Sequence, residues 1–214
     1  MVEWRVEGSC GVVKGREEDS LRVNATGPLR LHVSNELKWS ALNKCVTDVI
    51  VSSHCCNESV KMLDLSELKY LKRIEIGDDC FTSVDEVKLD QMGELKSIGM
   101  NSFTKHKNGI GNDTNRHFYV KNCPSLKELK MGRYSFSDYT LCEIKNDDAL
   151  ETIEIGSMTQ RSSNFNCGSF MLKSSPFFGD SRVDMPALKT LQVGYGAFCR
   201  CDYVALESGF FFSS

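Results

Sequence analysis

Residues 68–81 read LKYLKRIEIGDDCF, and this stretch decides the fold because close copies of it recur along the chain. The copies share an anchor leucine, an apolar pair that encloses one polar residue, a glycine, and a phenylalanine that follows a small residue. Self-similarity of this kind is the signature of repeat architectures. The anchor leucines are Leu71, Leu95, Leu126, Leu150 and Leu188, and a weaker copy lies at Val46–Val51.

The anchor leucines recur with a period of about 24 residues, which lies within the range typical of repeat architectures. Two intervals, from Leu95 to Leu126 and from Leu150 to Leu188, are longer and hold insertions. Lysine follows four of the five anchors, and the glycine suits a tight turn.

A second apolar pair lies between the anchors, so each unit holds two stretches with the alternation of half-buried strands. We therefore expect a β-rich repeat solenoid of about six coils of about 24 residues, with two short strands per coil. The second pairs are Leu63-Leu65, Val87-Leu89, Phe118-Val120, Cys142-Ile144 and Phe170-Leu172.

The repeat resembles the leucine-rich-repeat superfamily. Residues 122–131 read NCPSLKELKM, which is similar to the L-x-x-L-x-L core of that family with a preceding Cys-Pro. The runs Ile76–Phe81 and Val193–Phe198 are similar to the I-G-x-x-A-F signature of the BspA-like branch. The asparagine that ordinary leucine-rich repeats place after the strand is absent. The resemblance covers residues 45–200 and implies a leucine-rich-repeat-like solenoid that binds other proteins.

The chain divides into three regions around this array. We expect residues 1–44 to form an N-terminal cap over the first coil, and residues 45–200 to form the solenoid itself. Residues 201–214 form a C-terminal tail that ends in GFFFSS and has no polar capping character. We therefore expect either that the stack of repeats continues beyond this tail or that this end of the array packs against another surface.

The composition excludes several classes of protein. Of the 214 residues, 41% are hydrophobic and 26% are charged, which is ordinary for a globular chain. A net charge of -3 gives no overall attraction to nucleic acid, and no apolar run is long enough for a membrane span. The N-terminal MVEWRVE lacks the features of a secretory signal. We expect a cytoplasmic protein, or a surface or secreted one if a signal sequence lies upstream.

The ten cysteines favour buried thiols over a disulfide framework or a metal site. Disulfide frameworks belong to short secreted domains that lack a sufficient core. The runs His54-Cys55-Cys56 and Cys199-Arg200-Cys201 lack the paired C-x2-C spacing of structural zinc sites. We therefore expect most of the cysteines to be reduced, and we expect no metal and no cofactor.

No complete catalytic arrangement is visible in the sequence. His54 adjoins Cys55, but neighbours on an extended strand point to opposite faces. The Gly-rich run at 108–112 lacks the Lys-[Ser/Thr] of a phosphate-binding loop. We therefore expect a protein-interaction module without catalytic activity. The alternative is a structural or cell-surface array without one defined partner.

Two regions are candidates for binding another protein. Outward positions of the first strands are Glu75, Gly99, Lys130, Glu154 and Gln192, which form either a recognition face or a solvated sheet face with a Lys130–Glu154 pair. The insertions are the second candidate, because insertions in repeat proteins map to loops that often bind. Their candidate residues are Lys105, His106, Lys107, Arg116, Arg161, Phe177, Phe178 and Arg182.

Overall fold

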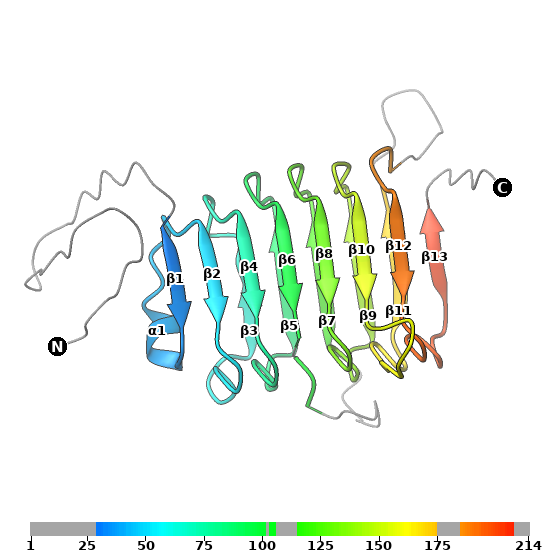
Figure 1. Ribbon diagram of the computed structural model, residues 1–214, viewed down its shortest axis with the longest axis horizontal. Helices are drawn as coiled ribbons and strands as arrows, with labels where there is room; N and C mark the ends of the chain where they lie inside the picture. Colours follow the sequence, from blue (N-terminus) through cyan, green and yellow to red (C-terminus); the bar gives the residue numbers. More distant parts are fainter. Residues whose placement is uncertain (1–28, 102, 106–114, 175–184, 208–214) are drawn as a thin grey trace, which may run out of the picture.

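The computed structural model describes residues 29–101, 103–105, 115–174 and 185–207. This part of the chain is rich in strands, and its one helix, α1 (Glu36–Ser40), has five residues. The strands form two parallel sheets that lie face to face (Figure 1). The seven-stranded sheet has the order β1 (Arg30–Val33), β2 (Asp48–Val51), β4 (Arg73–Ile76), β6 (Ser97–Met100), β8 (Glu128–Met131), β10 (Thr152–Ile155) and β12 (Thr190–Val193). The six-stranded sheet has the order β13 (Val204–Glu207), β11 (Ser169–Lys173), β9 (Leu141–Lys145), β7 (His117–Lys121), β5 (Glu86–Asp90) and β3 (Met62–Asp64).

The expected leucine-rich-repeat-like solenoid of about six coils is wrong, because the chain forms two flat parallel sheets of seven and six strands. The anchor motif that carries the resemblance accounts only for strands of the seven-stranded sheet. The second apolar pair builds a sheet of its own, whose strands reach five residues. The sheets also extend past the recognised repeats, since β1 lies within residues 1–44 and β13 lies within residues 201–214.

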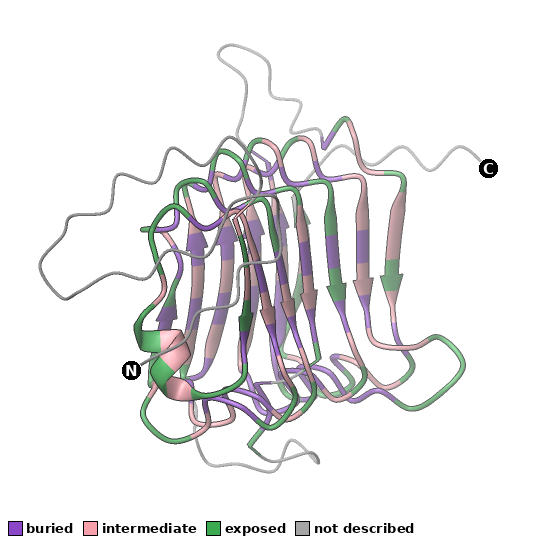
Figure 2. Ribbon diagram, turned by 60° about the vertical axis from the view of Figure 1, so that its left-hand side comes forward, coloured by how far each residue is buried: buried purple, intermediate pink, exposed green. Residues whose placement is uncertain are grey.

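The core lies between the two sheets and follows from the register of the strands. Ile74 of β4 pairs with Ile98 of β6, which pairs with Leu129 of β8, so apolar side chains form straight columns. These three side chains are at most 1% exposed. Along most strands, such as β4 and β6, buried residues alternate with partly exposed ones, as Figure 2 shows. The alternation read in the sequence therefore separates a shared core from two outer faces.

A column of stacked phenylalanines runs along one edge of this core. Neighbouring ring centroids are 4.8–5.4 Å apart, and the ring planes are within 10° of parallel. Each of these phenylalanines has a positive φ, between 45° and 72°. Because this backbone conformation costs a bulky residue about 1–3 kcal/mol, ring burial and stacking must offset the strain at every turn. The column consists of Phe81, Phe103, Phe136, Phe165 and Phe198.

Close packing requires the recurring glycine at Gly77 and Gly194, whereas Gly156 has a positive φ of 76°. A Cβ atom on Gly194 would lie 2.7 Å from the backbone nitrogen of Ser157 and 2.8 Å from the carbonyl oxygen of Ile155. A Cβ atom on Gly77 would lie 2.7 Å from the backbone nitrogen of Ser53. Both contacts are with the preceding repeat. A side chain at this position would therefore push adjacent repeats apart.

Candidate functional site

The outer face of the seven-stranded sheet carries one continuous row of outward side chains. Gly99 pairs with Glu75 on one side and with Lys130 on the other, and Lys130 pairs with Glu154. The outward positions read from the sequence are therefore confirmed for this row. No element of the described ranges lies over this face (Figure 1). The row forms an accessible surface on a regularly paired sheet.

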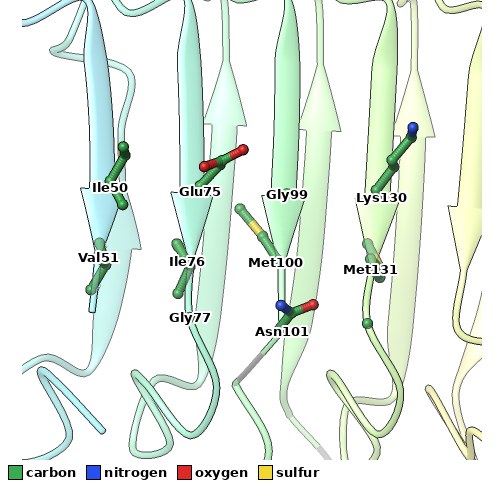
Figure 3. Close-up of a pocket in the computed structure, with 11 residues that line it drawn as sticks. Ile50, Val51, Glu75, Ile76, Gly77, Gly99, Met100, Asn101, Lys130 and Met131 are labelled. Atoms are coloured by element: carbon green, nitrogen blue, oxygen red, sulfur yellow. The ribbon is translucent and has the colours of Figure 1, made fainter. Parts of the chain in front are cut away.

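The face is hollowed around Gly99, as Figure 3 shows. The hollow has a volume of about 400 Å³ and is open to solvent. Glycine creates it, because the neighbouring outward positions are occupied by Glu75 and Lys130. A Cβ atom on Gly99 would meet nothing closer than Cγ of Glu75, at 3.7 Å, so a side chain could fill this space without a clash. The lining residues are Ile50, Val51, Glu75, Ile76, Gly77, Gly99, Met100, Asn101, Lys130, Met131 and Gly132.

The charges beside the hollow are balanced within the face. Glu75 pairs with Arg73 of its own strand. The ammonium of Lys130 lies 3.9 Å from the carboxylate of Glu128 and 3.8 Å from that of Glu154. The Lys130–Glu154 pair expected from the sequence is therefore present. Such exposed pairs contribute at most about 1 kcal/mol each, so they can rearrange when a ligand binds.

A row of lysines lies immediately before the strands of this sheet, at the edge of the outer face. The backbone N–H of Lys96 donates to the carbonyl of Lys72, and the N–H of Lys127 donates to that of Lys96, so the three residues are stacked. Lys127 pairs with Glu151 at 3.1 Å. Lys72 and Lys96 are exposed, and no acidic group of the described residues lies within ion-pair distance of either. The lysine that follows four of the five anchor leucines is the sequence signal for this row.

The candidate residues of the insertions are only partly described. Lys105 is exposed, and its backbone N–H donates to the Asp138 carboxylate at 3.1 Å. Arg161 is exposed, and its Nε donates to the hydroxyl of Ser163 at 3.1 Å. Both segments lie at the edge that holds the phenylalanine column. His106, Lys107, Phe177, Phe178 and Arg182 lie outside the described residues.

Arg116 lies inside the protein, because its side chain is 1% exposed. Its guanidinium forms an ion pair of 2.5 Å with Asp138, whose side chain is 2% exposed. Nε of Arg116 also donates to the carbonyl of Val84 at 3.2 Å, and the guanidinium lies 4.6 Å from the centre of the Tyr139 ring. The structure therefore brings Lys105 and Arg116 together around Asp138, but a ligand at the surface does not reach the guanidinium of Arg116.

The remaining titratable groups with large pKa shifts lie in the core. Burial raises the pKa of the Cys123 thiol to about 12 and also raises the pKa values of Cys56 and Cys142. All nine described cysteines are free thiols, and five of them are buried. Burial likewise raises the pKa of Asp147 to about 7. None of these groups lines the hollow at Gly99.

The run His54-Cys55-Cys56 is a candidate for metal binding or catalysis, and its side chains lie in different environments. His54 and Cys55 are neighbours, but His54 is exposed whereas Cys55 is 4% exposed. The imidazole of His54 lies 3.7 Å from the carboxylate of Asp79. The thiols of Cys55 and Cys56 lie 2.9 Å apart. Within the described ranges, no group of three histidine, cysteine or acidic side chains is arranged to hold a metal ion.

Over the same part of the chain, no helix is long and apolar enough to cross a lipid bilayer.

No family model, curated protein or solved structure matches this chain. The resemblance of the repeat motif to the leucine-rich-repeat superfamily stays a prediction from the sequence.

Proposed function

We propose that this chain is a protein-interaction module without catalytic activity, and that a polypeptide segment docks on the outer face of its seven-stranded sheet. The observation that carries the proposal is the hollow at Gly99 in an otherwise filled row of side chains. The row lies on a regular sheet, so the site exists before the ligand arrives. Such preorganisation lowers the entropic cost of binding.

The hollow suits one apolar side chain of the ligand. Ile50 provides an apolar wall on β2, whereas Ile76, Met100 and Met131 belong to the core and are at most 3% exposed, so they offer the ligand little apolar surface. Burying an aliphatic or aromatic side chain stabilises a complex by about 1.5–3 kcal/mol. Binding energy concentrates where such a side chain fills a preformed depression. We therefore place the anchor of the ligand over Gly99.

The row of lysines suits an acidic side chain of the same ligand. Lys96 precedes β6 and lies three residues before Gly99, about 10 Å along the strand, so it lies at the edge of the face and not in its outward row. Lys72 lies beside Lys96 on the adjacent repeat. These two exposed ammonium groups would give the complex salt-dependent affinity, because exposed charges are screened by ions. The ligand that fits is an extended peptide with an apolar residue and an acidic residue about 10 Å apart.

The experiment is a selection of displayed random peptides on the full chain, followed by affinity measurements on variants. Gly99→Leu fills the hollow, and we expect it to raise the dissociation constants of the selected peptides at least about tenfold, which corresponds to 1.4 kcal/mol. Thr152→Leu is the matched control, because it adds the same side chain to the same face on β10, outside the lining of the hollow. We expect less than about a threefold change there, or under 1 kcal/mol.

Melting temperatures of both variants separate loss of the site from loss of the fold. The proposal fails if the selected peptides bind Gly99→Leu as tightly as the unchanged chain. It also fails if the selection enriches no peptide at all. Retained binding together with sensitivity to changes at Lys105 or Arg161 would assign recognition to the insertions.

A further inference from the structure

The core between the two sheets is covered at the N-terminal end and less covered at the C-terminal end. At the N-terminal end, Trp39 of α1 packs edge-on against Phe81, with 4.8 Å between ring centroids. The carboxylate of Glu36 accepts hydrogen bonds of 2.8 and 3.2 Å from the backbone N–H groups of Glu58 and Ser59. These contacts fasten α1 to the segment that leads into β3. Inward residues at this end are covered, as Val33 is 0% exposed.

The C-terminal end is open over the described residues. Val204 and Leu206 of β13 pair in register with Phe170 and Leu172 of β11, which are 2% and 0% exposed. They therefore continue the columns of the core, yet they are 53% and 40% exposed. Inward residues of β12 are also only half-buried. The core is thus exposed where the two sheets end.

The edge strand β12 at this end lacks the charges that usually protect an edge against pairing, whereas β13 carries Glu207 at its end. Edge strands in natural proteins carry charges, proline or bulges that prevent a further strand from adding. The outward side chains of β12 are Thr190 and Gln192, which are uncharged. Neither β12 nor β13 has a strand of the described ranges on its outer side. Two unpaired edges of four residues each therefore flank an exposed apolar end.

We propose that this end, formed by β12 and β13, is the interface with a second copy of the same chain. A two-fold axis perpendicular to the sheets would place β12 antiparallel to β12 of the second copy and β13 antiparallel to β13. Both sheets would then continue across the contact, and the exposed residues Val204 and Leu206 would enter a shared core. Two-fold contacts of this kind use one self-complementary surface.

The N-terminal end of another copy fits this surface less well. α1 is fastened beside β1 and β3, so it blocks addition of strands to the six-stranded sheet (Figure 1). Arg30 and His32 of β1 are exposed, which places polar side chains along the other edge. A head-to-tail contact would also leave one open end at every stage and would grow without closing. The two-fold contact closes after two copies.

Sedimentation of the full chain in reductant, over a range of concentrations, tests this interface. We expect a species with twice the mass of one chain that dissociates on dilution. The double variant Val204→Lys with Leu206→Lys should shift the dissociation constant at least about a hundredfold, which is the effect of about 2.7 kcal/mol. Leu37→Lys is the control, because Leu37 is 64% exposed on α1 at the opposite end. It should leave the dimer unchanged.

Hydrogen exchange of the Val204–Glu207 amides gives a readout on the unchanged chain. We expect protection that increases with protein concentration. A single-chain mass at every concentration overturns the proposal, and protection independent of concentration would then show that another segment of the same chain covers this end. A dimer that survives the double variant, or one that Leu37→Lys disrupts, would also overturn it.

Discussion

The carboxyl group of Asp147 follows β9 and accepts a hydrogen bond of 2.7 Å from the backbone N–H of Cys123. The residue is 0% exposed, and its other carboxyl oxygen has no partner among the described residues. Burial disfavours the charged form, which is why the pKa rises from 3.8 to about 7. In the folded chain this group therefore holds a proton that the unfolded chain releases at lower pH.

The first prediction concerns the stability of the fold against pH. Because the folded pKa is raised, the contribution of Asp147 is greatest below pH 4 and decreases as the pH rises to about 7. Between pH 5.5 and 8 we expect the free energy of unfolding to decrease by about 2 kcal/mol, because Asp147 loses its proton in the folded chain. Urea denaturation at each pH measures this decrease. Asp147→Asn keeps an acceptor for Cys123 and should remove this dependence. Asp148→Asn changes an exposed neighbour and should keep it. Equal slopes of unfolding free energy against pH in the unchanged chain and in both variants would contradict this account.

At the scale of elements, the turns and the strands differ in how they are held. The strands are fixed by apolar columns, whereas the turn before β7 depends on the buried Arg116–Asp138 pair. Tyr139 adds a hydrogen bond of 2.6 Å from its hydroxyl to the carbonyl of Val84, which also accepts from Arg116. Segments 22 to 55 residues apart in the chain therefore meet at one polar cluster.

The second prediction concerns this cluster. Arg116→Met should destabilise the chain by about 3–5 kcal/mol, because it removes the guanidinium that balances the buried charge of Asp138. The double variant Arg116→Met with Asp138→Leu should recover a large part of this loss, since an apolar pair can replace a buried ion pair. Urea denaturation of the two single variants and the double variant measures the coupling. Additive losses would show that the two side chains act independently.

The sequence predicts the strands better than it predicts the turns. The apolar pairs and the outward row at Glu75, Gly99 and Lys130 follow directly from the repeat, because strand alternation is local. Phe165 was not recognised, because it lies much further from Gly156 in the chain than Phe81 lies from Gly77. The sequence predicts Arg116 as a binding residue because it lies in an insertion of the repeat. Its burial depends on Asp138 and Tyr139, which the repeat pattern does not connect to it.

The family resemblance misled the fold prediction for a related reason. The anchor motif describes one strand of each repeat, and it carries no information about the segment that faces it. The five-residue strands of the second sheet depend on pairings between successive repeats, such as Val87 with Phe118. The second apolar pair predicts a second strand in each unit, but the leucine-rich-repeat motif does not include that pair.

At the scale of the whole molecule, two surfaces differ in chemistry. The outer face of the seven-stranded sheet is polar and hollowed at Gly99, which suits a transient peptide ligand. The C-terminal end is apolar and bounded by open strand edges, which suits a second copy of the chain. The two surfaces do not share residues, since the hollow is lined by β2, β4, β6 and β8 and by the residues that follow them. A dimer would therefore present two peptide sites.

The most direct measurement of the central claim is a nuclear magnetic resonance titration of the isotope-labelled chain with a selected peptide. The account predicts the largest amide shifts at Glu75, Gly99 and Asn101, with smaller shifts near Lys72 and Lys96 and none on the strands of the six-stranded sheet. The largest shifts at Lys105 or Arg161, with the Gly99 amide unmoved, would contradict it.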